Sequence, residues 1–109
     1  MMNLKNPNQC NSLEELRIEI DKIDHQVVRL LAERLKYVEA VVDFKNDEEG
    51  VIAAERKDFV IRQRGEWAQE NGLDPITIKQ MYTVLIDRNI QHELELLNNK
   101  IKQTGTESK

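Results

Sequence analysis

Arg34 lies within a stripe of apolar residues at helical spacing, in the segment LLAERLKYVEA that spans residues 30–40. Burying a guanidinium without an anionic partner destabilises a protein by more than the packing of one helix stabilises it. Lys45 lies eleven residues further on, so on one helix it points the same way at a distance of about 16 Å. Two inward-pointing cations in a chain of net charge −4 indicate a binding site for an anion.

Arg17 lies at the edge of the same stripe, seventeen residues and about 25 Å before Arg34. Within one straight helix, these two guanidinium groups cannot bind the same small molecule. In an antiparallel arrangement of two chains they can, because Arg17 of one chain then lies alongside Arg34 of the other. The spacing therefore predicts a site that is shared between two copies of the chain.

Asn89 and Glu93 form a second set of polar residues where apolar ones are expected. They are spaced i, i+4, so they lie one turn apart on the same face of a helix. That face also carries Tyr82, Ile86 and Leu94. This pattern predicts a polar pocket within an apolar environment.

Each of these residues also has a purely structural interpretation. Arg34 could extend its aliphatic part along the helix, or pair with a carboxylate of the protein such as Glu93. Lys45 could interact with the dipole at a helix C-terminus. Arg17 could pair with Asp21 one turn later. A site is favoured because these residues occur together on apolar faces.

The first element that must position them is a long helix. Ser12 and Glu15 form an S-x-x-E capping box. Apolar residues then recur every three or four positions without Gly or Pro, which predicts a helix over about 13–45, roughly 50 Å long. A chain of 109 residues cannot cover a helix of this length by itself, so a partner chain is expected. The segment NDEEG, residues 46–50, is predicted to be a loop that could act as a lid.

Two further helices are predicted, over about 53–71 and from Pro75 to about 101. Gly72 is a typical helix stop, and Asp74 is a typical N-cap before a proline at the first helical position. The fold class is therefore all-α, with a long, a medium and a long helix. Three parts of the chain are expected: a flexible N-terminal arm (1–11), one helical domain (12–102) and a disordered tail (103–109).

Composition excludes several classes of function. The negative net charge and a pI of about 5.2 argue against binding to nucleic acid or to a membrane surface. Cys10 is the one cysteine, and neither His25 nor His92 has a second ligand at metal-binding spacing. We therefore expect no metal and no cofactor. The N-terminus lacks a signal-peptide pattern and no segment is long and apolar enough to span a membrane, so a cytoplasmic location is expected.

The sequence resembles the all-helical chorismate mutases, and within them the isochorismate pyruvate lyase branch. The resemblance covers about residues 10–97. It rests on LEELRIEIDKIDHQVVRLLAERLKYVEAVVDFK, with its R-x-x-I-D-x-I-D start, LLAER and final F-K, and on AAERKDFVIRQRGEWAQENGLDP. The pattern R-x-x-WA-x-ENGLDP is similar to the lyase branch in particular.

This resemblance implies an intertwined homodimer with two equivalent sites for a small dianionic substrate. Each site takes one arginine from the partner chain, and Arg17 matches that position. Arg34 matches the arginine that binds a substrate carboxylate, and Lys45 matches the lysine that contacts the ether oxygen and a carboxylate. The candidate catalytic residues are Arg34, Lys45 and Glu93, and the candidate substrate-binding residues are Arg17, Arg34, Lys45, Glu55 and Asn89.

Several positions distinguish the two branches. Mutases typically carry arginine at the position of Ala54, often aspartate at Val51, and a small hydroxyl residue at Asn89. The expected activity is therefore isochorismate pyruvate lyase, forming salicylate and pyruvate, with chorismate mutase activity. The alternatives are a dedicated chorismate mutase, which forms prephenate, and a non-catalytic helical dimer that serves as an interaction module. Glu93 stands where relatives carry glutamine or sometimes glutamate, and it can assist only when protonated.

Overall fold

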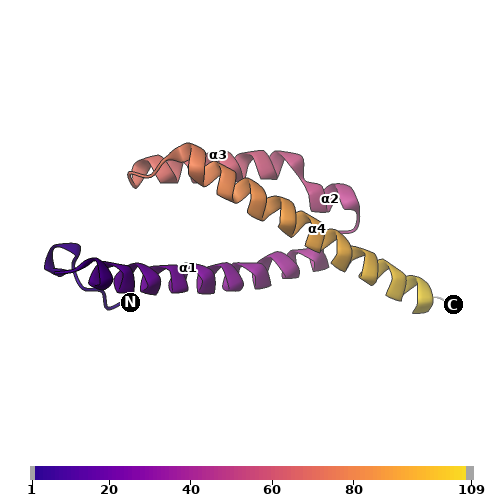
Figure 1. Cartoon of the computed structure of the whole chain (residues 1–109). Coiled ribbons are helices and arrows are strands. Elements are labelled where there is room, and N and C mark those ends of the chain that lie inside the picture. Colours follow the sequence, from indigo (N-terminus) through magenta and orange to yellow (C-terminus); the bar gives the residue numbers. More distant parts are fainter. Residues whose placement is uncertain (1, 108–109) are drawn as a thin grey trace. The chain divides into compact units, whose positions relative to one another are not determined.

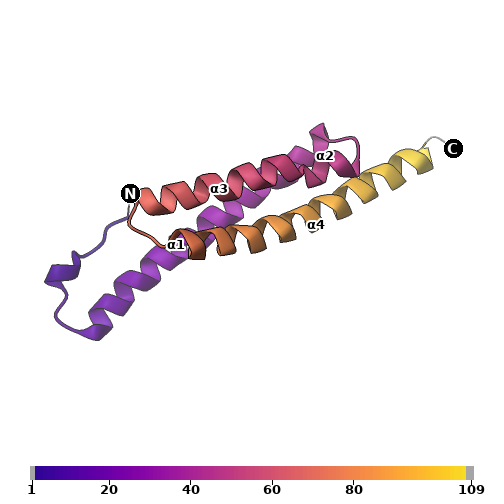
Figure 2. The same cartoon turned by 90° about the horizontal axis from the view of Figure 1, so that it is seen from above.

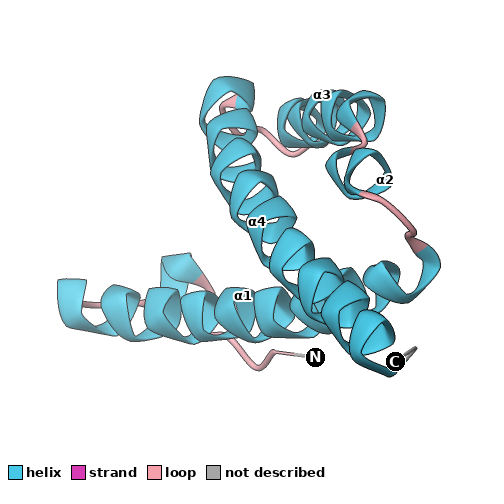
Figure 3. Cartoon of the chain, turned by 90° about the vertical axis from the view of Figure 1, so that its right-hand side faces the viewer, coloured by secondary structure: helices cyan, strands magenta, loops and turns pink. Residues whose placement is uncertain are grey.

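The computed structural model describes residues 2–107, and the side chains up to residue 102. The described part contains helices and no strand (Figure 1, Figure 3). The elements in order are the 3-10 helix η1 (Pro7–Gln9), α1 (Leu13–Val41), the 3-10 helix η2 (Val42–Phe44), α2 (Glu48–Ile52), α3 (Ala54–Glu70) and α4 (Pro75–Glu107). The all-α prediction is confirmed, and α2 is an additional short helix. The chain divides into two units, one up to Lys36 and one from Tyr37 onward, and each is described by itself.

In the first unit, α1 leaves its apolar stripe uncovered. None of its 29 residues is buried. The stripe residues are between 37% and 66% exposed: Leu13, Leu16, Ile20, Ile23, Val27, Leu30, Leu31 and Leu35. A contiguous apolar surface of this kind is typical of an interaction site, because burying it against a partner removes apolar area from water and is favourable.

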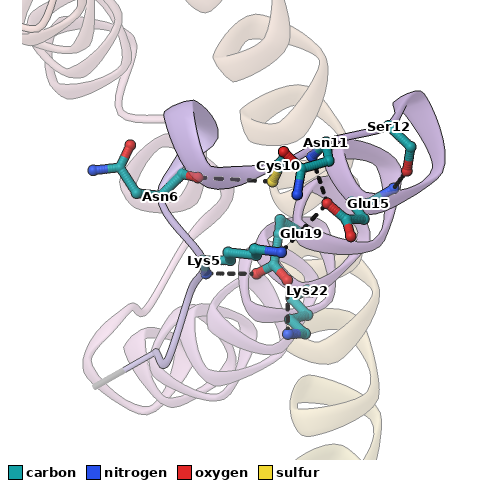
Figure 4. A network of polar contacts seen from close by, with 8 residues as sticks. All are labelled: Lys5, Asn6, Cys10, Asn11, Ser12, Glu15, Glu19 and Lys22. Atoms are coloured by element: carbon teal, nitrogen blue, oxygen red, sulfur yellow. Dashed lines mark hydrogen bonds and ion pairs between the residues drawn. The ribbon is translucent and has the colours of Figure 1, made fainter.

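The N-terminal arm lies against the first turns of α1 (Figure 4). The Lys5 backbone N–H donates to Glu19 at 3.1 Å, and the Lys5 ammonium pairs with Glu15 at 3.3 Å. Ser12 caps the helix by accepting from the Glu15 N–H, but Glu15 in turn accepts from the Asn11 N–H, one residue before the predicted box. That Asn11 bond, followed by Lys5, lowers the pKa of Glu15. The flexibility expected for the arm stays a prediction.

The end of α1 differs from the prediction of a helix to about residue 45. Regular helix ends at Val41, η2 follows, and Lys45 has an extended backbone with φ −110° and ψ 139°. The predicted loop NDEEG instead contains the start of α2, because Asp47 accepts a hydrogen bond from the Gly50 N–H at 2.7 Å and so caps a new helix. Ala53, with φ 40°, is the left-handed residue that joins α2 to α3.

The α3–α4 connection forms as the sequence predicts. Gly72 has φ +73° and follows the C-cap Asn71. The Leu73 N–H donates to the Ala68 carbonyl at 2.8 Å, and the Gly72 N–H donates to Gln69, which is the pattern of a Schellman motif. Asp74 then accepts from the backbone of Ile76 and Thr77 and from the Thr77 hydroxyl.

Replacing Asp74 with Ala is expected to lower the Tm by several degrees at neutral pH. The Thr77 hydroxyl, followed by the Ile76 and Thr77 N–H groups, lowers the pKa of Asp74. A lowered pKa in the folded state contributes stability at neutral pH, and that contribution is lost as the pH falls through the folded-state pKa. The Tm difference between the two proteins should therefore shrink in acid, as thermal melts at several pH values would show. A constant difference would contradict this account.

In the second unit, α3 lies alongside α4 (Figure 1, Figure 2). Val60, Gly65 and Ala68 of α3 are buried, as is Ile86 of α4. A smaller apolar cluster joins η2, α2 and α4, and its members are Val42, Val51 and Leu97, with Ile90, Leu94 and Leu96 packed against it. Lys57 of α3 also pairs with Asp87 of α4 at 2.5 Å.

The last helix is longer than predicted. α4 runs to Glu107, whereas the sequence predicted an end near residue 101 and a disordered tail over 103–109. The helix end near residue 101 is therefore wrong, because 102–107 contains no proline that would stop a helix, whereas the disorder expected for the tail stays a prediction. Residues 108–109 lie outside the described residues. No helix of the described chain is both long enough and apolar enough to cross a membrane.

Candidate active site

Arg17 and Arg34 both lie on α1, in the first unit. Arg17 is exposed and Arg34 is half-buried. Helix α1 is continuous between them, so their Cα atoms are about 25 Å apart by the rise of an α-helix. One chain therefore does not bring these two guanidinium groups together, as the sequence predicted.

Lys45 lies in the second unit and is held between η2 and α2. Its backbone N–H donates to the Val42 carbonyl at 3.1 Å. Its aliphatic chain runs beside Gly50, since a Cβ built there would lie 3.4 Å from the Lys45 Cδ. The side chain is half-buried. Both the end of η2 and the first turn of α2 thus define where this ammonium group lies.

Asn89 and Glu93 are one turn apart on α4, as predicted. Asn89 is half-buried, and Glu93 is buried with 8% of its surface exposed. Apolar side chains lie on the same side of the helix, among them Ile86 and Leu97. Burial disfavours the charged form of a carboxyl group, whereas a nearby cation favours it. A carboxyl in this setting is suited to respond to the charge of a bound molecule.

Glu55 is the least enclosed of the predicted residues. It is exposed in the first turn of α3, where an acidic residue interacts favourably with the helix dipole. Ala54, immediately before it, is also exposed. Val51 is only 4% exposed and belongs to the apolar cluster with Leu97, so an aspartate there would lose a favourable contact.

The six candidate residues all lie within one match to a known family. The profile of the chorismate mutase type II family matches residues 16–94, which is most of the chain. The chain belongs to this family. It is 34% identical over 92 residues to the isochorismate pyruvate lyase of Pseudomonas aeruginosa. This alignment covers 84% of the present chain and 91% of the Pseudomonas protein. It is 27% identical over 89 residues to a bifunctional chorismate mutase/prephenate dehydratase of Buchnera aphidicola, of which it covers 23%.

One feature of this chorismate mutase domain is an arginine that lies close to two aromatic rings. The Arg64 guanidinium lies 4.5 Å from the Trp67 ring centre and 5.7 Å from that of Tyr82 on α4. It also donates to Gln63 at 2.6 Å, while its Nε is buried without a hydrogen-bond partner. The R-x-x-W spacing of the sequence thus has a packing role at the α3–α4 contact.

Sequence reasoning missed a polar pair beside the candidate site. His92 Nε2 lies 2.8 Å from Glu39 Oε2, which links α4 to the last turns of α1. The available signal was the position of His92 next to Glu93, but the partner is 53 residues away in the sequence. Within the described residues, no group of three or more His, Cys, Asp or Glu side chains is arranged to hold a metal ion.

Proposed function

We propose that this protein is an isochorismate pyruvate lyase that forms salicylate and pyruvate and also has chorismate mutase activity. The observation that carries the proposal is the 34% identity across 91% of the Pseudomonas lyase. Two positions support the lyase over the mutase branch. Val51 is buried among apolar side chains, and Ala54 offers no cation at the start of α3.

The residues suit an intramolecular reaction of a dianion. Isochorismate carries two carboxylates, and an arginine is the natural bidentate partner for each. Arg34 of one chain and Arg17 of its partner would hold the two ends, so that the enolpyruvyl group folds over the ring. Orientation of this kind is the main entropic requirement of a unimolecular rearrangement.

Lys45 would act on the bond that breaks. As the C–O bond to the enolpyruvyl group breaks, a ring hydrogen passes to its methylene carbon, which yields salicylate and pyruvate without water or a redox partner. Negative charge develops on the ether oxygen during this step, and a fixed ammonium group stabilises it. Asn89 and Glu55 would contact the ring and its hydroxyl group.

A homodimer with two shared sites is part of the proposal. The uncovered apolar stripe of α1 supports it, because a second copy of the chain would bury that surface. The distance between Arg17 and Arg34 supports it independently, since only two chains can bring them to one substrate. A cytoplasmic location also stays an expectation.

Supplying the purified protein with each substrate tests the proposal. We expect isochorismate to yield salicylate, followed by its fluorescence, with kcat/KM at least about tenfold above that for conversion of chorismate to prephenate. The reverse preference would favour a dedicated chorismate mutase. Membership of the chorismate mutase type II family is the observation that supports this alternative. Turnover of neither substrate would favour a non-catalytic dimer.

Glu93 is expected to make the activity depend on pH. An ionised carboxylate beside the ether oxygen would repel the developing charge, so only protonated Glu93 can donate a hydrogen bond there. The kcat/KM of the wild type should therefore fall by up to about tenfold per pH unit above the transition. Glu93→Gln keeps a donor at every pH, so its profile should be flat over the same range. Two flat and equal profiles would contradict this role.

A further inference from the structure

The Glu39–His92 pair joins the two segments that carry the proposed ether-oxygen contacts. Glu39 lies on α1 six residues before Lys45, and His92 directly precedes Glu93 on α4. The pair is short, 2.8 Å between His92 Nε2 and Glu39 Oε2. It forms in either charge state of His92, provided that Nε2 carries a hydrogen.

A second contact holds the same segment to α4. The Lys100 ammonium donates to the Val42 carbonyl at 3.5 Å, and this carbonyl also accepts the Lys45 backbone N–H. His92 and Lys100 are eight residues apart on α4, a rise of about 12 Å. Val42 itself packs in the apolar cluster with Leu97. The segment from Glu39 to Lys45 is therefore held to α4 by two polar contacts, at His92 and at Lys100. The apolar contact at Leu97 lies between them along α4.

We infer that Glu39 and His92 are positioning residues, which set the register of the Lys45 segment against the helix that carries Glu93. This inference rests on the proposed function, because it assigns to the pair a role in placing the cation that acts on the ether oxygen. Neither residue touches substrate in this account. Their effect passes through the backbone of η2 to Lys45.

The competing explanation is that the Glu39–His92 pair only stabilises the fold. The exposure of the two side chains distinguishes this explanation from a positioning role. The side chains of His92 and Glu39 are 38% and 42% exposed, and pairs at such sites contribute little to folding. The Lys57–Asp87 pair provides a matched control. It also ties α4 to another helix, with side chains 30% and 50% exposed, but neither of its residues belongs to the Glu39–Lys45 segment. Removing either pair should therefore cost similar stability.

The test compares both pairs in steady-state assays with isochorismate and chorismate. Glu39→Ala and His92→Ala remove the hydrogen bond and should each lower kcat about tenfold, because a small displacement of a catalytic group is costly. KM should change by less than about twofold, because the contact of Lys45 with the ether oxygen, which these variants weaken, acts mainly in the transition state. The control variants Lys57→Ala and Asp87→Ala should leave kcat within about twofold of wild type.

Charge reversal separates the pair from its individual residues. Glu39→Lys and His92→Glu alone should each be impaired, whereas the double variant should recover kcat to within about threefold of wild type. A double variant no better than the single ones, or control variants as impaired as the Glu39 and His92 variants, would overturn the inference.

Amine labelling followed by mass spectrometry gives a readout without turnover. The labelling rate of Lys45 should rise about threefold in Glu39→Ala and stay unchanged in Asp87→Ala, because only the former frees the segment. An unchanged rate in both variants would overturn the inference. A wild type that turns over neither substrate would instead overturn the proposed function, and the labelling of Lys45 would still decide whether the pair holds its segment.

Discussion

Replacing Lys45 with Met is expected to lower kcat by about 10²- to 10³-fold, the usual loss when a group that stabilises developing oxyanion charge is removed. Met keeps the apolar stem that runs beside Gly50, so the turn between η2 and α2 should keep its packing. KM should rise by less than about fivefold, because in the proposed site Arg34 and Arg17 still bind the carboxylates. Initial rates of salicylate formation over a range of isochorismate concentrations would measure both constants.

Lys36→Met is the control for that variant. Lys36 lies nine residues before Lys45, on α1, and its side chain is 70% exposed and pairs with Glu33 on the surface. Its removal should leave kcat and KM unchanged within about twofold. If Lys45→Met raised KM strongly and left kcat unchanged, Lys45 would be a residue for binding alone, and its assignment to the ether oxygen would be wrong.

The local signals in the sequence predicted the α3–α4 connection well. Gly72 and Asp74 are correct because a left-handed C-terminal residue and an aspartate cap depend on residues only one to five positions away. The polarity of NDEEG predicts a loop, but Asp47 is a good N-cap and starts the helix Glu48–Ile52 there. The end of α1 at Val41 was missed because its apolar pattern continues into η2.

The candidate site could be predicted in part for a related reason. Periodicity reports which face of a helix a residue occupies, so it correctly placed Glu93 among apolar neighbours and Asn89 one turn before it. It does not report which residue of another element lies opposite. The pairing of His92 with Glu39 therefore could not be derived from spacing, because the two residues lie on different helices, 53 positions apart in the sequence.

Mixing two inactive variants is expected to restore activity. Arg17→Ala and Arg34→Ala should each lower kcat/KM by at least about 10²-fold, because each removes a charged partner of a substrate carboxylate. In a mixed dimer, the Arg17→Ala chain still supplies Arg34, and the Arg34→Ala chain still supplies Arg17. One of the two sites is then complete and the other lacks both arginines. Random exchange at equal amounts should give about a quarter of the wild-type activity, which is measured after mixing and refolding the two variants together.

The size of this recovery distinguishes a shared site from a site within one chain. If Arg17 and Arg34 served the same site from one chain, every site of the mixed dimer would lack one arginine, and mixing would restore nothing. The double variant Arg17→Ala/Arg34→Ala supplies the complementary control. Exchanged with wild type, it leaves each mixed dimer with one site that lacks the partner's Arg17 and one that lacks Arg34, so total activity should fall by about half relative to the unmixed proteins. Activity gained on mixing the two single variants and activity lost on exchanging the double variant with wild type can arise together only if two chains contribute arginines to one site. The apolar stripe of α1 is the surface proposed to bring those chains together.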